Sequence, residues 1–403
     1  MPSAATLLLI MSVAVLAPLL ADGVSRRVRV PLVVFEIVLG IVIGPDVLGW
    51  ARPDQVIDVL SELGLSMLIF LAGYEIEFAD VRGGLLRRSL GAWLVSLAAG
   101  LGIALLLSGG DVSAALVVGT ALTSTALGTV LPVLKDAGEL KGRFGDVTMA
   151  FGAVGEFGPV IAMALLLSGR RPAESAAVLV AFGLITAGAV VLAMRPPAPW
   201  LSRLMVKTLH SSGQFAVRFV MLLLAAMLGL SEAFGLDVLL GAFAAGLLTR
   251  LVLDAAAPES GAEILGKVEA IGFGFLVPLF FVVTGIEFRL DELLGNPGTL
   301  ALVPVFLLLF LVVRGLPVYV LAPRDLGRSD RSALAFHAAT CLPLVVAITT
   351  IGVDQELLDG EEAAALVGAA MLSVLVLPLV AARLRRSGGT GPAERAPTDT
   401  EAW

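Results

Sequence analysis

The chain has 403 residues, of which 58% are hydrophobic and 15% are charged, and its formal net charge is −7. Soluble domains contain about 45–50% apolar and about 25% charged residues, and one hydrophobic core cannot bury this much apolar surface. The composition therefore excludes a soluble globular protein and predicts a chain folded within a lipid bilayer.

Thirteen apolar segments follow one another along the chain, each about 17–25 residues long and thus able to cross a bilayer as a helix. The connections between them are short and leave no room for a soluble catalytic domain. The first segment is followed by Arg26, Arg27 and Arg29, which favours a retained helix over a cleaved signal peptide. The predicted segments are 6–24, 31–50, 58–78, 88–108, 112–134, 144–168, 174–195, 214–231, 235–253, 266–287, 298–322, 331–353 and 362–383.

The basic residues support this number of spans and predict an orientation. When the loops alternate between the two sides, twenty-one of the 27 Lys and Arg residues fall on one side and four on the other. Positively charged loops stay in the cytoplasm, so we expect an outside N-terminus and a cytoplasmic C-terminus. The polar, Pro- and Gly-rich tail 387–403 is predicted to be disordered.

Few residues are available for enzyme or metal chemistry. The chain holds two histidines, His210 and His337, and one cysteine, Cys341, and these form no zinc or iron–sulfur spacing. No nucleophile–base pair or nucleotide-binding motif is evident. We therefore expect no cofactor, no nucleic-acid partner and no enzymatic activity.

The two halves of the chain resemble each other. The stretch Leu71–Phe78, which ends the third span, matches Val282–Phe288, which ends the tenth. Further along, Thr120–Leu140 aligns with His337–Leu357. Corresponding spans are separated by seven crossings, an odd number, so the two copies are inverted in the membrane. Inverted repeats are typical of secondary transporters, whose sites lie near the midplane where the copies meet.

The aligned fifth and twelfth spans both carry polar or proline-containing stretches in their middle. Thr123, Ser124 and Thr125 lie in the first, and Thr340 and Cys341, followed by Leu342 and Pro343, lie in the second. Such stretches predict two broken helices whose freed backbone groups line an aqueous site. The alternative is that the hydroxyls bond back to carbonyls one turn earlier and that Pro343 only kinks its helix.

Two charges lie deep in the predicted spans. Glu156 is at the centre of the sixth span and Arg314 is near the centre of the eleventh. Each costs about 2.5–3.5 kcal/mol at the bilayer centre on insertion scales. Their similar depth predicts that they pair, either as a structural ion pair or as part of an ion pathway. Other acids, including Glu36 and Glu75, lie near span ends and are weaker candidates.

A buried carboxylate can bind a proton or a hard monovalent cation, but not both at once. Glu156 is therefore the predicted ion-binding and proton-binding residue, with Arg314 as its coupling partner and the polar groups of the two breaks as further ligands. Gly152, Gly155 and Gly158 recur every three residues beside Glu156, which predicts close helix packing at the site.

Over residues 5–385 the sequence resembles the bacterial cation/proton antiporter 2 family. The resemblance lies in Glu36–Pro45, Phe70–Glu75 and Gly119–Thr125, in the acid of span six and in the basic residue of span eleven. It implies an inner-membrane exchanger with about thirteen helices, a core of six helices with two crossed broken helices, a dimerisation domain and an elevator-like motion. The ion-binding acid of the family falls on Glu156, and its basic residue falls on Arg314.

The resemblance also implies a domain division and a homodimer. We expect one membrane exchanger domain over residues 1–386. Its core helices are predicted at about 58–168 and 266–383, and its dimerisation or scaffold helices at about 6–50 and 174–253.

Some residues depart from the family pattern. Members usually carry Asp, Asn or Gln before the key acid, where this chain has Gly155, and the key acid is usually Asp. The Arg-Gly-Glu often found in span twelve is replaced by Thr340, Cys341 and Leu342. The missing second acid favours electroneutral one-for-one exchange of Na⁺, K⁺ or Li⁺ for H⁺. A sodium-coupled symporter of an organic solute is the alternative, because Gly155 and the altered span twelve predict a roomier, less charged site.

Overall fold

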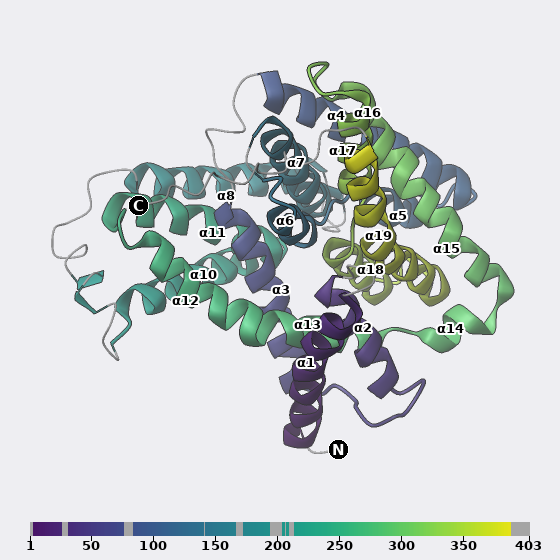
Figure 1. Ribbon diagram of the computed structural model, residues 1–403, viewed down its shortest axis with the longest axis horizontal. Coiled ribbons are helices and arrows are strands. Elements are labelled where there is room, and N and C mark those ends of the chain that lie inside the picture. The colour runs from purple at the N-terminus through teal and green to yellow at the C-terminus, as the bar shows by residue number, and fades with distance from the viewer. Residues whose placement is uncertain are drawn as a thin grey trace, which may run out of the picture.

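The computed structural model describes residues 3–25, 31–75, 84–140, 142–166, 172–193, 204–205, 207–208 and 213–387. All regular secondary structure in these residues is helical (Figure 1). In the described ranges, ten helices or runs of adjoining helices are long and apolar enough to cross a membrane, and three shorter apolar helices accompany them. Together they coincide with the thirteen predicted segments, which confirms the predicted all-α polytopic fold. The predicted disordered tail lies outside the described residues.

The helices follow one another along the chain with short connections. In chain order they are α1 (Ser3–Ser25), α2 (Leu32–Ile43), α3 (Gln55–Glu75), α4 (Gly84–Leu107), α5 (Val112–Ala121), α6 (Leu127–Asp136), α7 (Arg143–Leu166), α8 (Pro172–Ala193), α10 (Phe215–Ala233), α11 (Val238–Ala256), α12 (Gly261–Ile271), the π-helical segment η1 (Gly272–Leu276), α13 (Val277–Glu287), α14 (Leu290–Gly295), α15 (Pro297–Leu309), the π-helical segment η2 (Phe310–Gly315), α16 (Leu316–Leu321), α17 (Arg328–Ala338), α18 (Pro343–Asp354) and α19 (Gly360–Ser387).

Short polar side chains determine where several of these helices begin. The Asp111 carboxylate accepts from the amides of Ser113 and Ala114 at the start of α5, at 2.8 and 3.3 Å. The Asp237 carboxylate accepts from the Leu239 amide at 2.8 Å and starts α11 in the same way. The first amides of a helix have no partner within the helix, so these aspartates supply the missing acceptors.

The helices pack as two groups (Figure 1). In the first group, α3 packs on α11, α13 on α2 and on α3, and α10 on α11. In the second group, α4 packs on α5 and α7, while α17 and α15 pack on α19. We call these the first helix group (α1 to α3 and α10 to α13) and the second helix group (α4 to α7 and α15 to α19). Helix α8 contacts both, through α11 and α7.

This packing differs from the predicted division at two spans. Spans 58–78 and 266–287, expected among the core helices, form α3 and α12–α13, which pack in the first group. Glycines explain the close approach of their backbones. A Cβ added at Gly64 would lie 2.2 Å from the Leu276 carbonyl oxygen, and one at Gly246 would lie 2.0 Å from that of Phe70. These contacts require a bare backbone, which span hydropathy does not reveal.

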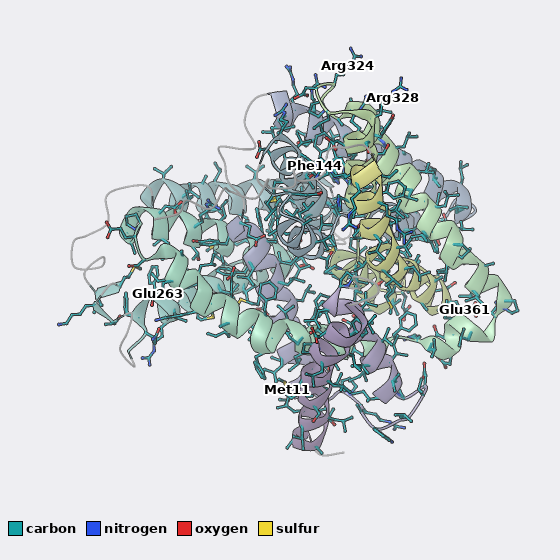
Figure 2. All side chains as sticks on the ribbon, viewed as in Figure 1. Met11, Phe144, Glu263, Arg324, Arg328 and Glu361 are labelled. Carbon is teal, nitrogen blue, oxygen red and sulfur yellow. The ribbon has the colours of Figure 1, made fainter. Side chains whose placement is uncertain are left out.

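The two ends of the helix bundle differ in the charges they carry. Arg324 and Arg328 lie at the end where α16 turns into α17, whereas Glu361 lies at the opposite end, at the start of α19 (Figure 2). The basic end also holds Arg385, near the end of α19.

Candidate ion-binding site

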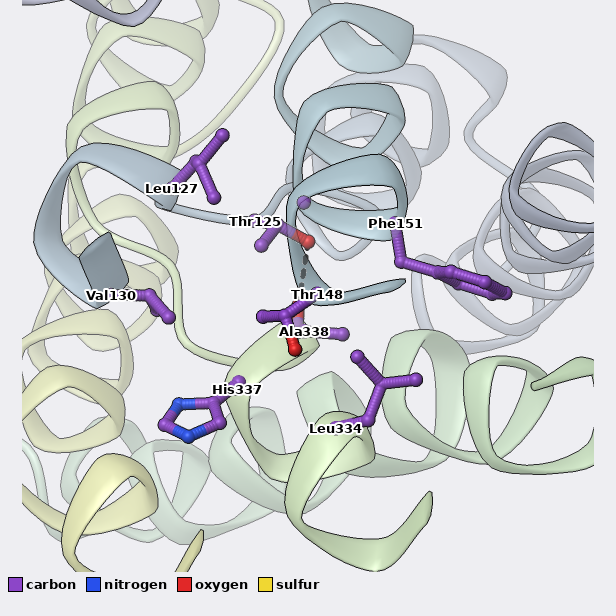
Figure 3. A pocket seen from close by; sticks show the side chains of 9 residues that line it. Thr125, Leu127, Val130, Thr148, Phe151, Leu334, His337 and Ala338 are labelled. Atoms are coloured by element: carbon purple, nitrogen blue, oxygen red, sulfur yellow. Dashed lines mark hydrogen bonds between the residues drawn. The ribbon is translucent and has the colours of Figure 1, made fainter. Parts of the chain in front are cut away.

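The two predicted helix breaks are present, and they contact each other. Residues 122–126 separate α5 from α6, and residues 339–342 separate α17 from α18. The Ala126 amide donates to the Thr340 carbonyl at 2.7 Å. The Thr125 hydroxyl donates to the Ala338 carbonyl at 2.6 Å (Figure 3). Backbone groups freed by one break are therefore satisfied by the other, so the crossing needs both copies of the repeat.

The sixth span joins the same crossing. The Thr125 amide donates to the Gly155 carbonyl of α7 at 3.0 Å. A helical carbonyl normally accepts from the amide four residues later. The crossing is thereby tied to α7 at the residue directly before Glu156.

The hydroxyls of the breaks also bond locally. Thr123 donates to the Thr120 carbonyl and Ser124 to the Ala121 carbonyl, both at 2.8 Å. Thr340 donates to the Phe336 carbonyl at 3.1 Å. Both interpretations of these hydroxyls are therefore met: the helices are broken, and the hydroxyls still donate to carbonyls one turn earlier.

Ser373 of α19 completes the second break, and sequence analysis did not single it out. The Cys341 amide donates to the Ser373 hydroxyl at 3.0 Å, and this hydroxyl lies 2.9 Å from the Cys341 carbonyl and 2.7 Å from that of Ala370. Ser373 is 0% exposed. A single hydroxyl thus serves the freed amide and carbonyl of Cys341. A lone serine in an apolar helix was the available signal, but it does not reveal its partner.

Glu156 lies in α7 and is 3% exposed. Its carboxylate interacts with the backbone amide of Leu127, the first residue of α6. The N-terminus of a helix carries a partial positive charge, so the half-helix α6 offers Glu156 an electrostatic partner without a cationic side chain. Its Oε2 atom has no hydrogen-bond partner among the residues that the structure describes, and can therefore take a proton or a cation.

Arg314 lies in the π-helical segment η2 and is 0% exposed. Its Nε–H donates to the Thr125 hydroxyl at 3.0 Å and its Nη2–H donates to the Phe151 carbonyl at 2.7 Å. Its Nη1 atom is buried and has no partner within the described ranges. A single π-helical turn within an α-helix is frequent at functional sites, and in this protein the turn contains the buried cationic residue.

The predicted ion pair between Glu156 and Arg314 is not formed in this structure. Arg314 instead bonds the Phe151 carbonyl, which lies more than one helical turn before Glu156, and Thr125. Both of these acceptors are neutral. Among the described residues, the carboxylate of Glu75, at the end of α3, interacts electrostatically with Glu156. The sequence placed the two charges at equal depth but could not show the direction of either side chain.

Each of the three glycines close to Glu156 in α7 lies where a neighbour leaves no space for a side chain. A Cβ at Gly155 would lie 2.2 Å from Arg314 Nη2 and 2.3 Å from Thr125 Oγ1. At Gly152 it would lie 2.6 Å from the Leu127 side chain, and at Gly158 it would lie 2.1 Å from the Trp93 ring of α4. The three glycines therefore allow the Arg314 guanidinium and the neighbouring helices α6 and α4 to approach α7 closely.

Aromatic side chains connect the site to the first helix group. Phe157, the residue after Glu156, stacks on Phe243 of α11 with 3.5 Å between the ring centroids. Leu127 and Ala153 are buried in the same apolar cluster. The Glu156 carboxylate consequently lies close to the interface between the two helix groups.

The chain is similar in sequence to several known proteins. The chain is 26% identical over 397 residues to YjbQ of Bacillus subtilis (strain 168), covering 94% of this chain and 62% of that protein. It is 24% identical over 388 residues to a Na(+)/H(+) antiporter of Enterococcus hirae, covering 92% and 96%. The Na(+)/H(+)-K(+) antiporter GerN of Bacillus cereus is 27% identical over 285 residues, covering 69% and 70%.

The fold matches that of a solved structure. The sodium proton antiporter MjNhaP1 from Methanocaldococcus jannaschii superposes with a TM-score of 0.64 at 17% identity, covering 94% of this chain and 96% of the other. Residues 11–385, nearly the whole membrane part, match the family described as sodium/hydrogen exchanger, transmembrane. The chain therefore belongs to the transmembrane sodium/hydrogen exchanger family.

Proposed function

We propose that this protein exchanges a monovalent cation for protons across the membrane, with Glu156 as the group that binds both. One observation carries the proposal: Glu156 is buried beside two crossed helix breaks, and its Oε2 atom has no protein partner in the described part of the chain. Buried acids within membrane spans mark ion and proton pathways. The antiporters to which the chain is similar support the same function.

Competition for one carboxylate accounts for the coupling. A protonated Glu156 is neutral, and so is a carboxylate with one bound alkali cation, so both loaded forms carry the same charge. The empty carboxylate is the costly form in an apolar interior. The loaded forms are thus the ones expected to cross between the two sides, which yields exchange rather than leak.

The two helix groups provide a route for the motion. The second helix group holds Glu156, Arg314 and both breaks, and the first lies against it at Phe157 and Phe243. We propose that the second group moves as the transporting core against the first as a scaffold, in an elevator-like motion. This assigns α3 and α12–α13 to the scaffold, in contrast to the division expected from the sequence.

A one-for-one, electroneutral stoichiometry agrees with the residue before the acid. A second carboxylate at position 155 would occupy space that Arg314 and Thr125 already fill. Glu156 is then the acid in this turn of α7 that can take a proton. One proton exchanged for one monovalent cation moves no net charge.

The same geometry weighs against the alternative of an organic-solute symporter. That alternative rested in part on free space beside Gly155. The guanidinium of Arg314 and the hydroxyl of Thr125 fill this space, because an added Cβ would lie 2.2 and 2.3 Å from their atoms. An ion is the substrate that this part of the site fits best.

We further propose a bacterial inner-membrane location with an outside N-terminus and a cytoplasmic C-terminus, and assembly as a homodimer through the first helix group. The basic loops of the sequence and the basic end of the bundle support this orientation. Cysteine labelling from each side of the membrane and cross-linking in native vesicles test these assignments.

The central test is cation-dependent proton movement in everted vesicles that carry the protein. Addition of Na⁺, K⁺ or Li⁺ to respiring vesicles should dissipate the pH gradient, measured by recovery of acridine-dye fluorescence between pH 6 and 9. Glu156→Gln keeps the size of the side chain but removes the ionisable oxygen, so it should abolish the recovery.

Glu263→Gln is the matched control, because Glu263 is an acid on α12 that pairs with Lys267 and is 45% exposed. This variant should exchange like the wild type. Full exchange by Glu156→Gln would remove Glu156 from the mechanism. Sodium-dependent solute uptake without proton movement would favour the symporter.

A further inference from the structure

Helix α7 contains a proline three residues after Glu156. Pro159 is buried and lies inside the helix, which continues on both sides of it from Arg143 to Leu166. Proline has no N–H group, and its ring crowds the carbonyl four residues earlier. The carbonyl of Gly155 therefore cannot form its bond within the α-helix and needs a donor from elsewhere.

The first helix break supplies this donor. The Thr125 amide donates to the Gly155 carbonyl at 3.0 Å. Prolines are tolerated in membrane helices where a neighbouring segment satisfies the backbone groups that they free. Gly155 also leaves space for Thr125, because an added Cβ would lie 2.3 Å from the Thr125 hydroxyl oxygen. Gly155 and Pro159 thus act together, since the glycine gives Thr125 room and the proline frees the carbonyl that Thr125 binds.

The amides of Thr125 and Leu127, two residues apart, contact adjacent residues of α7. The first donates to the Gly155 carbonyl, and the second interacts with the Glu156 carboxylate. The side chain of Leu127 also lies against α7, because an added Cβ at Gly152 would lie 2.6 Å from it. The bond to the Gly155 carbonyl therefore holds the start of α6, which begins at Leu127, beside the carboxylate.

The Leu127 amide does not contribute equally to the two loaded forms of Glu156. A carboxylate that holds a cation remains ionised, whereas a protonated carboxyl group is neutral. Hydrogen bonds to an ionised acceptor are about twice as strong as bonds between neutral groups, and the N-terminus of α6 adds a partial positive charge. A cation can bind at Oε2, which has no partner among the described residues, without displacing the amide. The amide therefore favours the cation-bound form over the protonated form.

We propose that Pro159 is a positioning residue that sets the apparent affinity of Glu156 for the transported cation. It keeps the Gly155 carbonyl free for the Thr125 amide, and this bond holds the start of α6 beside the carboxylate. Pro159 itself binds neither ion. The proposal rests on the proposed exchange function and deepens it, because it names a residue that adjusts the competition between the cation and the proton.

Replacement of the proline should weaken this arrangement in a defined way. Pro159→Ala restores an amide at position 159, which can donate to the Gly155 carbonyl as in a regular α-helix. The new amide competes with the Thr125 amide for the same oxygen. The start of α6 is then held less closely beside Glu156, and the cation-bound form loses more than the protonated form.

The first test measures the alkali-cation concentration that gives half-maximal dequenching in everted vesicles at constant pH. Pro159→Ala should raise this concentration by about threefold or more and keep the maximal rate within about threefold. A role in folding alone would lower the amount of active protein, and thus the maximal rate, without changing the half-maximal concentration. An unchanged half-maximal concentration would overturn the proposal.

Two further variants control for the substitution itself. Pro159→Gly restores the same amide without a side chain and should shift the half-maximal concentration in the same direction. Pro304→Ala is the matched control, because Pro304 also lies inside a helix, α15, and the carbonyl that it frees, that of Leu300, is not part of the crossing. This control should saturate like the wild type. A shift as large as that of Pro159→Ala would show that the effect does not depend on the Gly155 carbonyl.

A double variant tests whether Pro159 acts through the start of α6. Leu127→Pro removes the amide that interacts with Glu156, and proline is well accommodated at the first position of a helix. This variant should itself raise the half-maximal concentration. Pro159→Ala should then add nothing to it, because substitutions that act through one contact are not additive. A further rise in the double variant would mean that Pro159 acts in another way, and the assignment would be wrong.

Failure of this inference can be distinguished from failure of the exchange function. If the wild type exchanges, Glu156→Gln does not, and Pro159→Ala saturates like the wild type, the exchange function stands and the role of Pro159 falls. If Glu156→Gln exchanges normally, the site itself is wrongly assigned, and the role given to Pro159 falls with it.

Discussion

Arg314 and Thr125, which are 189 positions apart in the chain, are joined by a hydrogen bond of 3.0 Å from guanidinium to hydroxyl. The same hydroxyl donates to the carbonyl of Ala338 at the end of α17. The Arg314 guanidinium is therefore connected to both helix breaks through the Thr125 hydroxyl oxygen. This contact and the hydrogen bond to the Phe151 carbonyl, and not an ion pair with Glu156, hold Arg314 in place in this structure.

Removing the Thr125 hydroxyl should impair transport strongly. Thr125→Val leaves Arg314 Nε–H without an acceptor, and an unsatisfied buried donor costs about 1–3 kcal/mol, more if it is charged. We expect exchange to fall about tenfold or more, since about 1.4 kcal/mol corresponds to a factor of ten. Thr125→Ser keeps the oxygen and should stay within about threefold. Vesicle dequenching rates compare the two, and equal activity would mean that Arg314 needs no bond to this residue.

Gly155→Ala should displace Arg314. The new methyl group would lie 2.2 Å from Nη2, so either the guanidinium or α7 must move. Overpacking of this kind costs about 1–3 kcal/mol, and we expect a lower thermal midpoint in detergent together with loss of exchange. Gly183→Ala is the control, because an added Cβ on α8 has no neighbour within 4 Å. A wild-type midpoint for Gly155→Ala would show that Arg314 has room to adjust.

Ser373→Ala tests the hydroxyl that serves the second break. The variant leaves the buried Cys341 amide without its acceptor, at a cost of about 1–3 kcal/mol. Ser96→Ala is matched in burial, but Ser96 only donates to the carbonyl of Ala92, one turn earlier. Thermal unfolding should show a clear loss for the first variant and little change for the second. Equal losses would mean that Ser373 has no special part in the break.

Substitution of Asp330, in the first turn of α17, and of Asp325, in the loop before this helix, should differ in their effect on stability. Asp330→Asn removes one of two carboxylates from Arg385, whose side chain is 7% exposed. Loss of a hydrogen bond to a charged group costs about 1.5–3 kcal/mol. Asp325→Asn removes a pair with Arg143 in which both side chains are 54% exposed, and such pairs contribute little. The thermal midpoint should therefore fall by more for Asp330→Asn.

The pH dependence of the Arg143–Asp325 pair follows from the direction in which the pKa of Asp325 is shifted. The Arg143 guanidinium, which donates a hydrogen bond to Asp325, holds the pKa of that carboxyl below its usual range. A lowered pKa adds stability above the unfolded value of about 3.9, and this stability is lost as the pH falls through the folded value. The small difference between wild type and Asp325→Asn should thus stay constant from pH 7 to pH 5. A difference that grows over this interval would contradict the assignment.

The sequence was most informative where a property depends on one segment alone. Thirteen spans follow from local hydropathy, and both helix breaks follow from polar or proline-containing residues in the middle of apolar runs. The depth of Glu156 and Arg314 follows from their place in their spans. Ser373, Trp93 and Glu75 were missed as neighbours of these features, because nothing in their local sequence indicates which helix they face.

By itself, the sequence determined that this is a multi-span membrane protein with inverted halves and two ionisable residues at mid-depth, since burying charge and apolar surface has a cost that is set locally. The tertiary structure alone decided that Arg314 binds Thr125 and the Phe151 carbonyl instead of Glu156, and that α3 and α12–α13 pack with the first helix group. Both depend on the rotation of one helix against another. That rotation is set by close packing at residues such as Gly155, Gly64 and Gly246, which become neighbours of their partners only when the chain is folded.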